Sequence, residues 1–118
     1  MSQRNGRATR YAVNLPVRYR LAGSEACGTG WTENLSVSGL LFTTAAMLGV
    51  GNQIEVWVQM WSDTTEVNRS TLYCNGSVVR QVERNDWHAA AVRITRIRVV
   101  PPVPDFTDAE APWRGERL

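Results

Sequence analysis

Two short sets of polar residues have the types and spacing of a ligand-binding site. The first is Asn34-Leu35-Ser36-Val37-Ser38-Gly39, which lies between two segments with strand-like patterns. On an extended strand end Asn34 and Ser36 point the same way, so both would offer hydrogen-bonding groups to one ligand. Gly39 can adopt a positive φ at little cost and lets backbone and ligand approach closely. The same residue types also make an ordinary turn, in which Asn and Ser side chains bond nearby backbone.

The second set is a group of arginines near the N-terminus. Arg4, Arg7 and Arg10 lie in a leader that contains no acidic residue, and all 13 basic residues of the chain are arginines. Guanidinium groups bind phosphates and guanine edges bidentately and stack on ring faces, which lysine does poorly. The net charge of +2 is too small to indicate general binding to DNA or RNA. A solvated basic leader is the alternative interpretation.

The elements that must position these residues have the pattern of β-strands. Residues 11–21 alternate between apolar and polar types, which is typical of a half-buried strand. Further strands are expected at residues 25–33, 40–44, 54–61, 71–84 and 87–94, with a polar hairpin loop at 62–70. Six short strands without a clear helical period predict an all-β fold, a small antiparallel barrel or sandwich.

The chain length of 118 residues fits one domain. Residues 1–9 are expected to form a mobile leader, residues 10–98 the β-domain, and residues 99–118 a Pro-rich extended segment and tail. The prolines after Val100 exclude a helix there, and residues 105–111 are expected to form a short helix or to stay extended.

Several classes of function are excluded by composition and spacing. Cys27 and Cys74 share no metal-ligand spacing with each other or with His88, so we expect two free thiols, no metal and no cofactor. No Ser-His-Asp order or paired carboxylates indicate an enzyme. No apolar run approaches the roughly 20 residues that span a bilayer, and the N-terminus lacks the apolar core of a signal peptide, so a cytoplasmic protein is expected. The tryptophans Trp31, Trp57, Trp61 and Trp87 are expected in the core or at the barrel ends.

The order of several segments resembles a PilZ domain. These are the arginine leader, the strand NLPVRYR, the turn NLSVSG followed by LLF, and the segments GNQIEVWV and GSVVRQV, and the resemblance runs from about Arg7 to Ile94. It implies a six-stranded antiparallel β-barrel, usually followed by a C-terminal helix, that binds the bacterial second messenger cyclic di-GMP. The family's two ligand motifs are RxxxR before the first strand and (D/N)xSxxG after the second.

The resemblance assigns ligand contacts to residues of both sets. Asn34, Ser36 and Gly39 match the second motif in full. Arg10 takes the place of the second arginine of RxxxR, whereas Gly6 stands four residues before it, so Arg7 is expected to replace the missing arginine.

Two further arginines are candidates for ligand contact. Arg4 forms a further RxxR spacing with Arg7. Arg80 either faces the same cleft or lies on the general surface.

The implied function is that of a receptor and adaptor. Binding of cyclic di-GMP would order the arginine leader, which then signals to an effector protein in motility, exopolysaccharide or biofilm control. DNA, RNA and membrane insertion are not expected, and the protein would be a monomer or a dimer. The alternative is a PilZ-like interaction module that binds cyclic di-GMP weakly or not at all.

Overall fold

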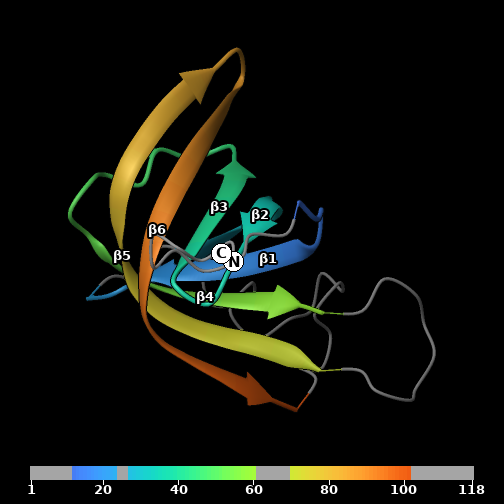
Figure 1. Cartoon of the computed structure of the whole chain (residues 1–118). Helices are drawn as coiled ribbons and strands as arrows, with labels where there is room; N and C mark the ends of the chain where they lie inside the picture. Colours follow the sequence, from blue (N-terminus) through green and yellow to red (C-terminus); the bar gives the residue numbers. More distant parts are fainter. Residues whose placement is uncertain (1–11, 24–26, 61–69, 102–118) are drawn as a thin grey trace, which may run out of the picture.

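The computed structural model describes residues 12–23, 27–60 and 70–101. They form six strands: β1 (Pro16–Leu21), β2 (Cys27–Leu35), β3 (Gly39–Thr44), β4 (Gln53–Gln59), β5 (Thr71–Arg84) and β6 (Trp87–Val100). All neighbouring strands are antiparallel, and the sheet closes in the order β1-β2-β3-β6-β5-β4 (Figure 1). The predicted six-stranded antiparallel barrel is thereby confirmed.

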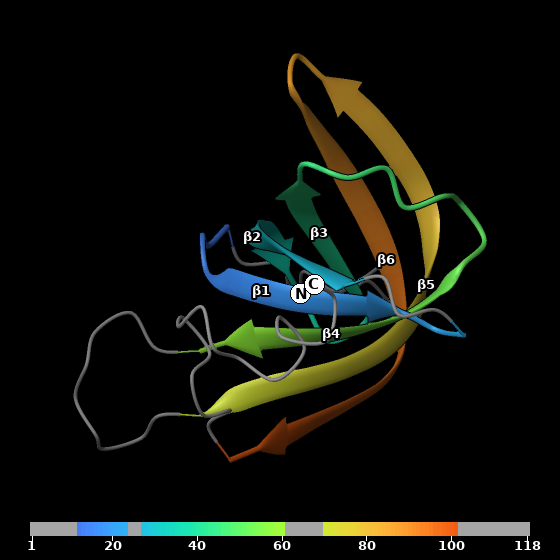
Figure 2. The same cartoon turned by 180° about the vertical axis from the view of Figure 1, so that it is seen from behind.

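The β5–β6 hairpin is the longest element and takes part in both halves of the barrel. Residues 71–77 of β5 pair with β4, whereas residues 88–93 of β6 pair with β3. The ladder between β5 and β6 is irregular at Asn75/Gly76 and at Val78/Arg80, and the hairpin curves strongly along its length (Figures 1 and 2). A Cβ at Gly76 would lie 2.2 Å from the carbonyl oxygen of Arg93, so the two strands can approach this closely only at a glycine.

The core follows from the alternation of side chains along the strands. Inward residues of all six strands and one loop residue, Leu48, form a single apolar cluster. It consists of Val17, Tyr19, Leu35, Leu40, Phe42, Leu48, Ile54, Val56, Val58, Cys74, Val78, Ala90, Val92 and Ile94. The Tyr19 hydroxyl lies 2.9 Å from Thr44 Oγ1, and burial raises the pKa of Tyr19. Gln81 Oε1 accepts hydrogen bonds from the backbone N–H groups of Leu48 and Gly49, which fixes the β3–β4 loop.

Two strand boundaries differ from the sequence prediction by more than two residues. The sixth strand was predicted to end at Ile94, but β6 continues to Val100, because its second half pairs with the start of β5 and Ile97 packs on the core. Val99 and Val100 are therefore strand residues. The first strand was predicted from residue 11 but begins at Pro16.

The predicted leader, most of the hairpin loop at 62–70 and the predicted tail helix lie outside the described residues. In the part of the chain that is described, no helix is long and apolar enough to cross a membrane.

The tryptophans that the structure describes lie outside the core, which was one of the two places predicted for them. Trp31 and Trp87 are 53% and 52% exposed, and neither belongs to the core. Trp57 is half-buried and faces outward, opposite Tyr73 of β5. No disulfide joins Cys27 and Cys74.

The buried Cys74 thiol makes stability depend on alkaline pH. Burial raises its pKa from 9.0 to about 12. Between pH 9 and about pH 12 the unfolded chain has lost a proton that the folded chain retains. Below pH 9 both states keep the proton, so this group does not affect the free energy of unfolding there. Above it, that free energy should fall by up to about 1.4 kcal/mol per pH unit. Urea unfolding between pH 8 and about pH 10 measures the fall, and Cys74→Val should flatten it. Equal slopes for wild type and Cys74→Val would contradict the assignment.

Candidate functional site

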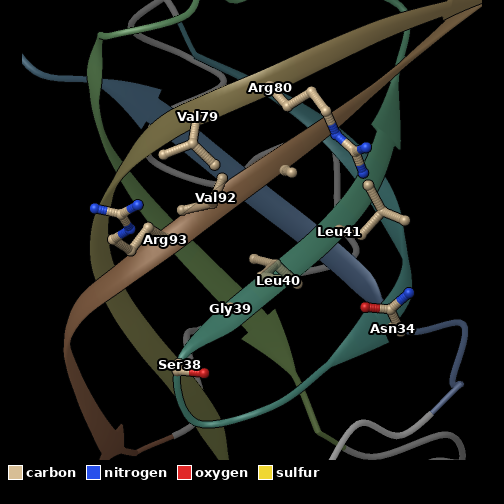
Figure 3. A pocket seen from close by; sticks show the side chains of 10 residues that line it. Asn34, Ser38, Gly39, Leu40, Leu41, Val79, Arg80, Val92 and Arg93 are labelled. Atoms are coloured by element: carbon tan, nitrogen blue, oxygen red, sulfur yellow. The ribbon is translucent and has the colours of Figure 1, made fainter. Parts of the chain in front are cut away.

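A cleft of about 200 Å³ lies on the outer face of the barrel where β2, β3, β6 and β5 are neighbours (Figure 3). It is lined by Asn34, Ser38, Gly39, Leu40, Leu41, Val79, Arg80, Ala91, Val92 and Arg93. Three of the predicted ligand residues, Asn34, Gly39 and Arg80, therefore meet at one place although 46 positions separate the first from the last.

A bulge in β2 turns Asn34 toward the cleft. Thr32 is fully buried and pairs with the core residue Phe42, whereas Asn34 pairs with the outward residue Leu41. The register shifts between Thr32 and Asn34, so Glu33 is the extra residue. Without the bulge, Thr32 and Asn34 would lie on the same face of the strand, and the Asn34 amide would be directed into the core.

Ser36 braces the turn between β2 and β3 and does not line the cleft. It is only 7% exposed. Its Oγ accepts hydrogen bonds from the N–H groups of Ser38 (3.3 Å) and Gly39 (3.1 Å) and donates to the Gly39 carbonyl (3.3 Å). The expectation that Asn34 and Ser36 face one ligand together is not met in this geometry, because the strand ends at Leu35 and Ser36 turns inward. The neighbouring Ser38, which the sequence analysis missed, is exposed and lines the cleft.

Gly39 lies at the floor of the cleft without an intramolecular need for glycine. Its φ is not positive, unlike those of Gly23, Gly49 and Gly51. A Cβ built at Gly39 would find its nearest neighbour, the Val92 carbonyl oxygen, at 3.6 Å, which is an ordinary contact. The missing side chain therefore leaves room in the cleft rather than room within the barrel.

Two arginines make the cleft electropositive. Arg80 of β5 reaches across β6 toward Leu41, and Arg93 of β6 lies at the opposite side (Figure 3). None of the residues that line the cleft is acidic. Between the guanidinium groups the floor is apolar, with Leu41, Val79 and Ala91. The site thus combines positive charge with flat apolar surface, which suits an anion that carries rings. Arg93 was not predicted as a site residue, although its outward-facing position in a strand of alternating side chains could have indicated it.

The segment before β1 runs beside the strand that bears Asn34. Thr32 holds it: the Thr32 N–H donates to the Leu15 carbonyl (2.9 Å), the Leu15 N–H donates to Thr32 Oγ1 (2.8 Å), and Thr32 Oγ1 donates to the Val13 carbonyl. Asn14 Nδ2 adds a bond to the Thr32 carbonyl at 2.8 Å. Arg4, Arg7 and Arg10 lie outside the described residues, but the description begins at residue 12, two positions after Arg10. Two extended residues span roughly 7 Å.

An ion pair shapes the outer face beside the cleft. Arg84 Nη1 of β5 lies 2.7 Å from Glu33 Oε2 of β2, although β6 and β3 separate these strands in the sheet. The two side chains therefore reach toward each other over β6 and β3. The pair involves the bulge residue Glu33 and therefore links the curved hairpin to the strand segment that orients Asn34.

The described residues contain no group of three His, Cys, Asp or Glu side chains that could hold a metal ion. His88 lies on β6 opposite Thr44, away from the cleft lining.

Comparison with known proteins gives a family and a fold. The sequence model of the PilZ domain matches residues 3–101. No curated protein sequence matches the chain. Among solved structures, the Bacillus subtilis inhibitor of motility (MotI/DgrA) is similar, with a TM-score of 0.63 and 12% identity over 94% of this chain and 50% of that chain. This chain thus spans half the length of that structure, and the likeness at this identity concerns the fold.

Ser36→Ala should destabilise the protein through the turn. The substitution leaves the N–H groups of Ser38 and Gly39 without their acceptor in a partly buried place, so we expect a loss of about 1–2 kcal/mol in the free energy of unfolding. Urea unfolding measures the loss. Ser38→Ala is the matched control and should change stability by less than about 0.5 kcal/mol. Equal effects of the two substitutions would show that the Ser36 hydroxyl does not brace the turn.

Proposed function

Because this chain belongs to the PilZ family, a family of regulatory binding modules in cyclic di-GMP signalling, we propose that it is a receptor for cyclic di-GMP. The ligand lies in the cleft over β2, β3, β6 and β5, and the loaded protein acts on an effector protein. The observation that carries the proposal is the convergence of Asn34, Gly39 and Arg80 on one electropositive cleft without an acidic lining residue.

The residue types of the cleft match the chemical groups of the ligand. Cyclic di-GMP presents guanine O6/N7 edges, ring faces and two phosphate charges. Arg80 and Arg93 can bind a phosphate or a guanine edge bidentately. The Asn34 amide both donates and accepts, as the guanine Watson–Crick edge requires. Leu41 and Ala91 offer flat apolar surface to a ring, and Gly39 lets the ligand approach the backbone.

The arginine leader supplies the second half of the site. Its attachment point beside Thr32 is two residues from Asn34, so Arg10 and Arg7 are within reach of a ligand in the cleft. The ligand bridges these arginines to the barrel and orders the leader, which presents a new surface to the effector. Ordering opposes binding by about 1–2 kcal/mol per residue, so Arg7 and Arg10 must both make strong contacts. Arg4 is close enough in sequence to add a third.

Calorimetric titration with cyclic di-GMP tests the site. Wild type should bind, and Arg10→Ala and Arg80→Gln should each weaken binding about tenfold to a hundredfold, because each removes a charge-assisted bidentate contact. Arg96→Gln is the matched control, since Arg96 lies on β6 outside the cleft, and it should leave the affinity unchanged. Binding that survives both Arg10→Ala and Arg80→Gln would place the ligand elsewhere.

Gly39→Ala should separate ligand binding from folding. The new methyl group fits the barrel but occupies the cleft, so we expect wild-type stability within about 0.5 kcal/mol and a loss of affinity of at least about tenfold. Gly76→Ala serves as the contrasting control, because its methyl group meets a backbone carbonyl and should destabilise the barrel by about 1–3 kcal/mol. Unchanged affinity in Gly39→Ala would remove this glycine from the ligand site.

An interaction module without the ligand is the second candidate, and the glycine at position 6 favours it. In that case wild type shows no heat of binding and no amide shifts at Asn34 or Gly39 with millimolar cyclic di-GMP, while the barrel remains folded.

A further inference from the structure

A second organised surface lies on the opposite half of the hairpin from the cleft. Outward side chains form two rows across β1, β4, β5 and β6, following the strand register. One row is Arg20, Glu55, Asn75 and Arg96, and the other contains Trp57, Tyr73 and Arg98. In Figure 1 these four strands follow one another in the lower half of the barrel. We call the set Arg20, Glu55, Trp57, Tyr73, Arg96 and Arg98 the arginine–aromatic face.

Side-chain contacts between neighbouring strands hold the face together. Arg20 Nε lies 3.2 Å from Glu55 Oε1, and the Tyr73 hydroxyl donates to Glu55 Oε2 at 2.5 Å. The rings of Trp57 and Tyr73 are 5.3 Å apart and tilted by 43°. Cation–π contacts close both ends, with Arg20 Cζ at 5.7 Å from the Trp57 ring and Arg98 Cζ at 5.3 Å from the Tyr73 ring. Side chains fixed in this way lose little conformational entropy on binding.

The charge on this face is unbalanced. Its one acid, Glu55, is shared by Arg20 and Tyr73. Arg96 and Arg98 are exposed, and within the described ranges neither has a carboxylate partner. The Arg98 guanidinium lies over the Tyr73 ring, and this contact restricts its orientation. A planar donor group held in one orientation favours bidentate carboxylates over a diffuse ion atmosphere.

The arrangement of the rings argues against single-stranded nucleic acid. Base stacking needs a free aromatic face. Here one face of Tyr73 is covered by Arg98, and Trp57 is in contact with both Arg20 and Tyr73. The groups left to contact a partner are therefore the bidentate N–H donors of the arginines, beside a small apolar edge.

We propose that the arginine–aromatic face is a docking site for an acidic segment of a partner protein, with Arg96 and Arg98 binding its carboxylates. The site does not depend on cyclic di-GMP, because none of its residues lines the cleft. Charge complementarity identifies the occupant. Arg96 and Arg98 are exposed alternate residues of β6, and alternate residues of an extended acidic strand would bring two carboxylates to them.

Binding of a defined acidic peptide to the full chain tests this proposal. The probe is a fluorescent twelve-residue peptide of alternating Glu and Ser, compared with the Gln/Ser peptide of equal length. The Glu peptide should bind at least tenfold more tightly and should shift the amide signals of Tyr73, Arg96 and Arg98. Arg96→Gln/Arg98→Gln should reduce the affinity at least tenfold. The double variant Arg80→Gln/Arg84→Gln removes the same charge elsewhere on the hairpin and should reduce it less than threefold.

Three results would overturn the proposal. Equal loss in the two double variants would mean attraction by net charge alone. Tighter binding of a twelve-residue oligothymidine at the same face would assign it to nucleic acid. If the Glu peptide binds only after Asp105→Asn, Asp108→Asn and Glu110→Gln are introduced together, the occupant is the chain's own C-terminal segment rather than a partner. A circular dichroism spectrum of each variant establishes that it is folded.

Discussion

The close contact between Gly76 of β5 and the carbonyl of Arg93 in β6 is the constraint on which the rest of the barrel depends. A Cβ at Gly76 would lie 2.2 Å from the Arg93 carbonyl oxygen, so no side chain fits there. The register of the ladder shifts at Asn75/Gly76 and again at Val78/Arg80. The hairpin can therefore bend sharply enough to pair with β4 at one end and with β3 at the other. Closure of the sheet removes the exposed strand edges that an open six-stranded sheet would carry.

The same bend divides the hairpin into two surfaces of different character. Beyond Gly76, Arg80 and Arg93 surround an apolar floor that has no acidic residue. Before it, Tyr73 and Arg98 belong to a network in which aromatic rings, guanidinium groups and one carboxylate contact each other directly. The cleft offers space for a ligand, whereas the other surface is already packed and offers only the outer edges of its arginines.

Strand periodicity was sufficient to predict an all-β fold of six strands, because side-chain alternation records which face of each strand is buried. The choice of a barrel over a sandwich came from the resemblance to the PilZ domain. The predicted limits of β5, Thr71 and Arg84, match the structure. The end of β6 was missed, because the strand was predicted to stop at Ile94 and continues to Val100. A strand end depends on its partner, here the start of β5, and this pairing is not visible locally.

The candidate site was predicted in part, and the missing part has a physical reason. Asn34, Gly39 and Arg80 were identified, and the structure brings them together. Ser36 was expected beside Asn34 because an unbroken strand places alternate residues on one face. Neither the bulge at Glu33 nor the inward turn after Leu35 can be inferred from residue types alone, because both depend on pairing with β3.

Asn34, Ser36 and Gly39 meet three different structural requirements in the turn. Asn34 needs the bulge to reach the outer face, Ser36 needs to turn inward to bind two backbone N–H groups, and Gly39 needs to carry no side chain. The need for glycine at position 39 does not come from packing within the barrel, because a methyl group would fit there without strain. A glycine that the fold does not require, at the floor of an electropositive cleft, is what the proposed ligand site in this cleft would need.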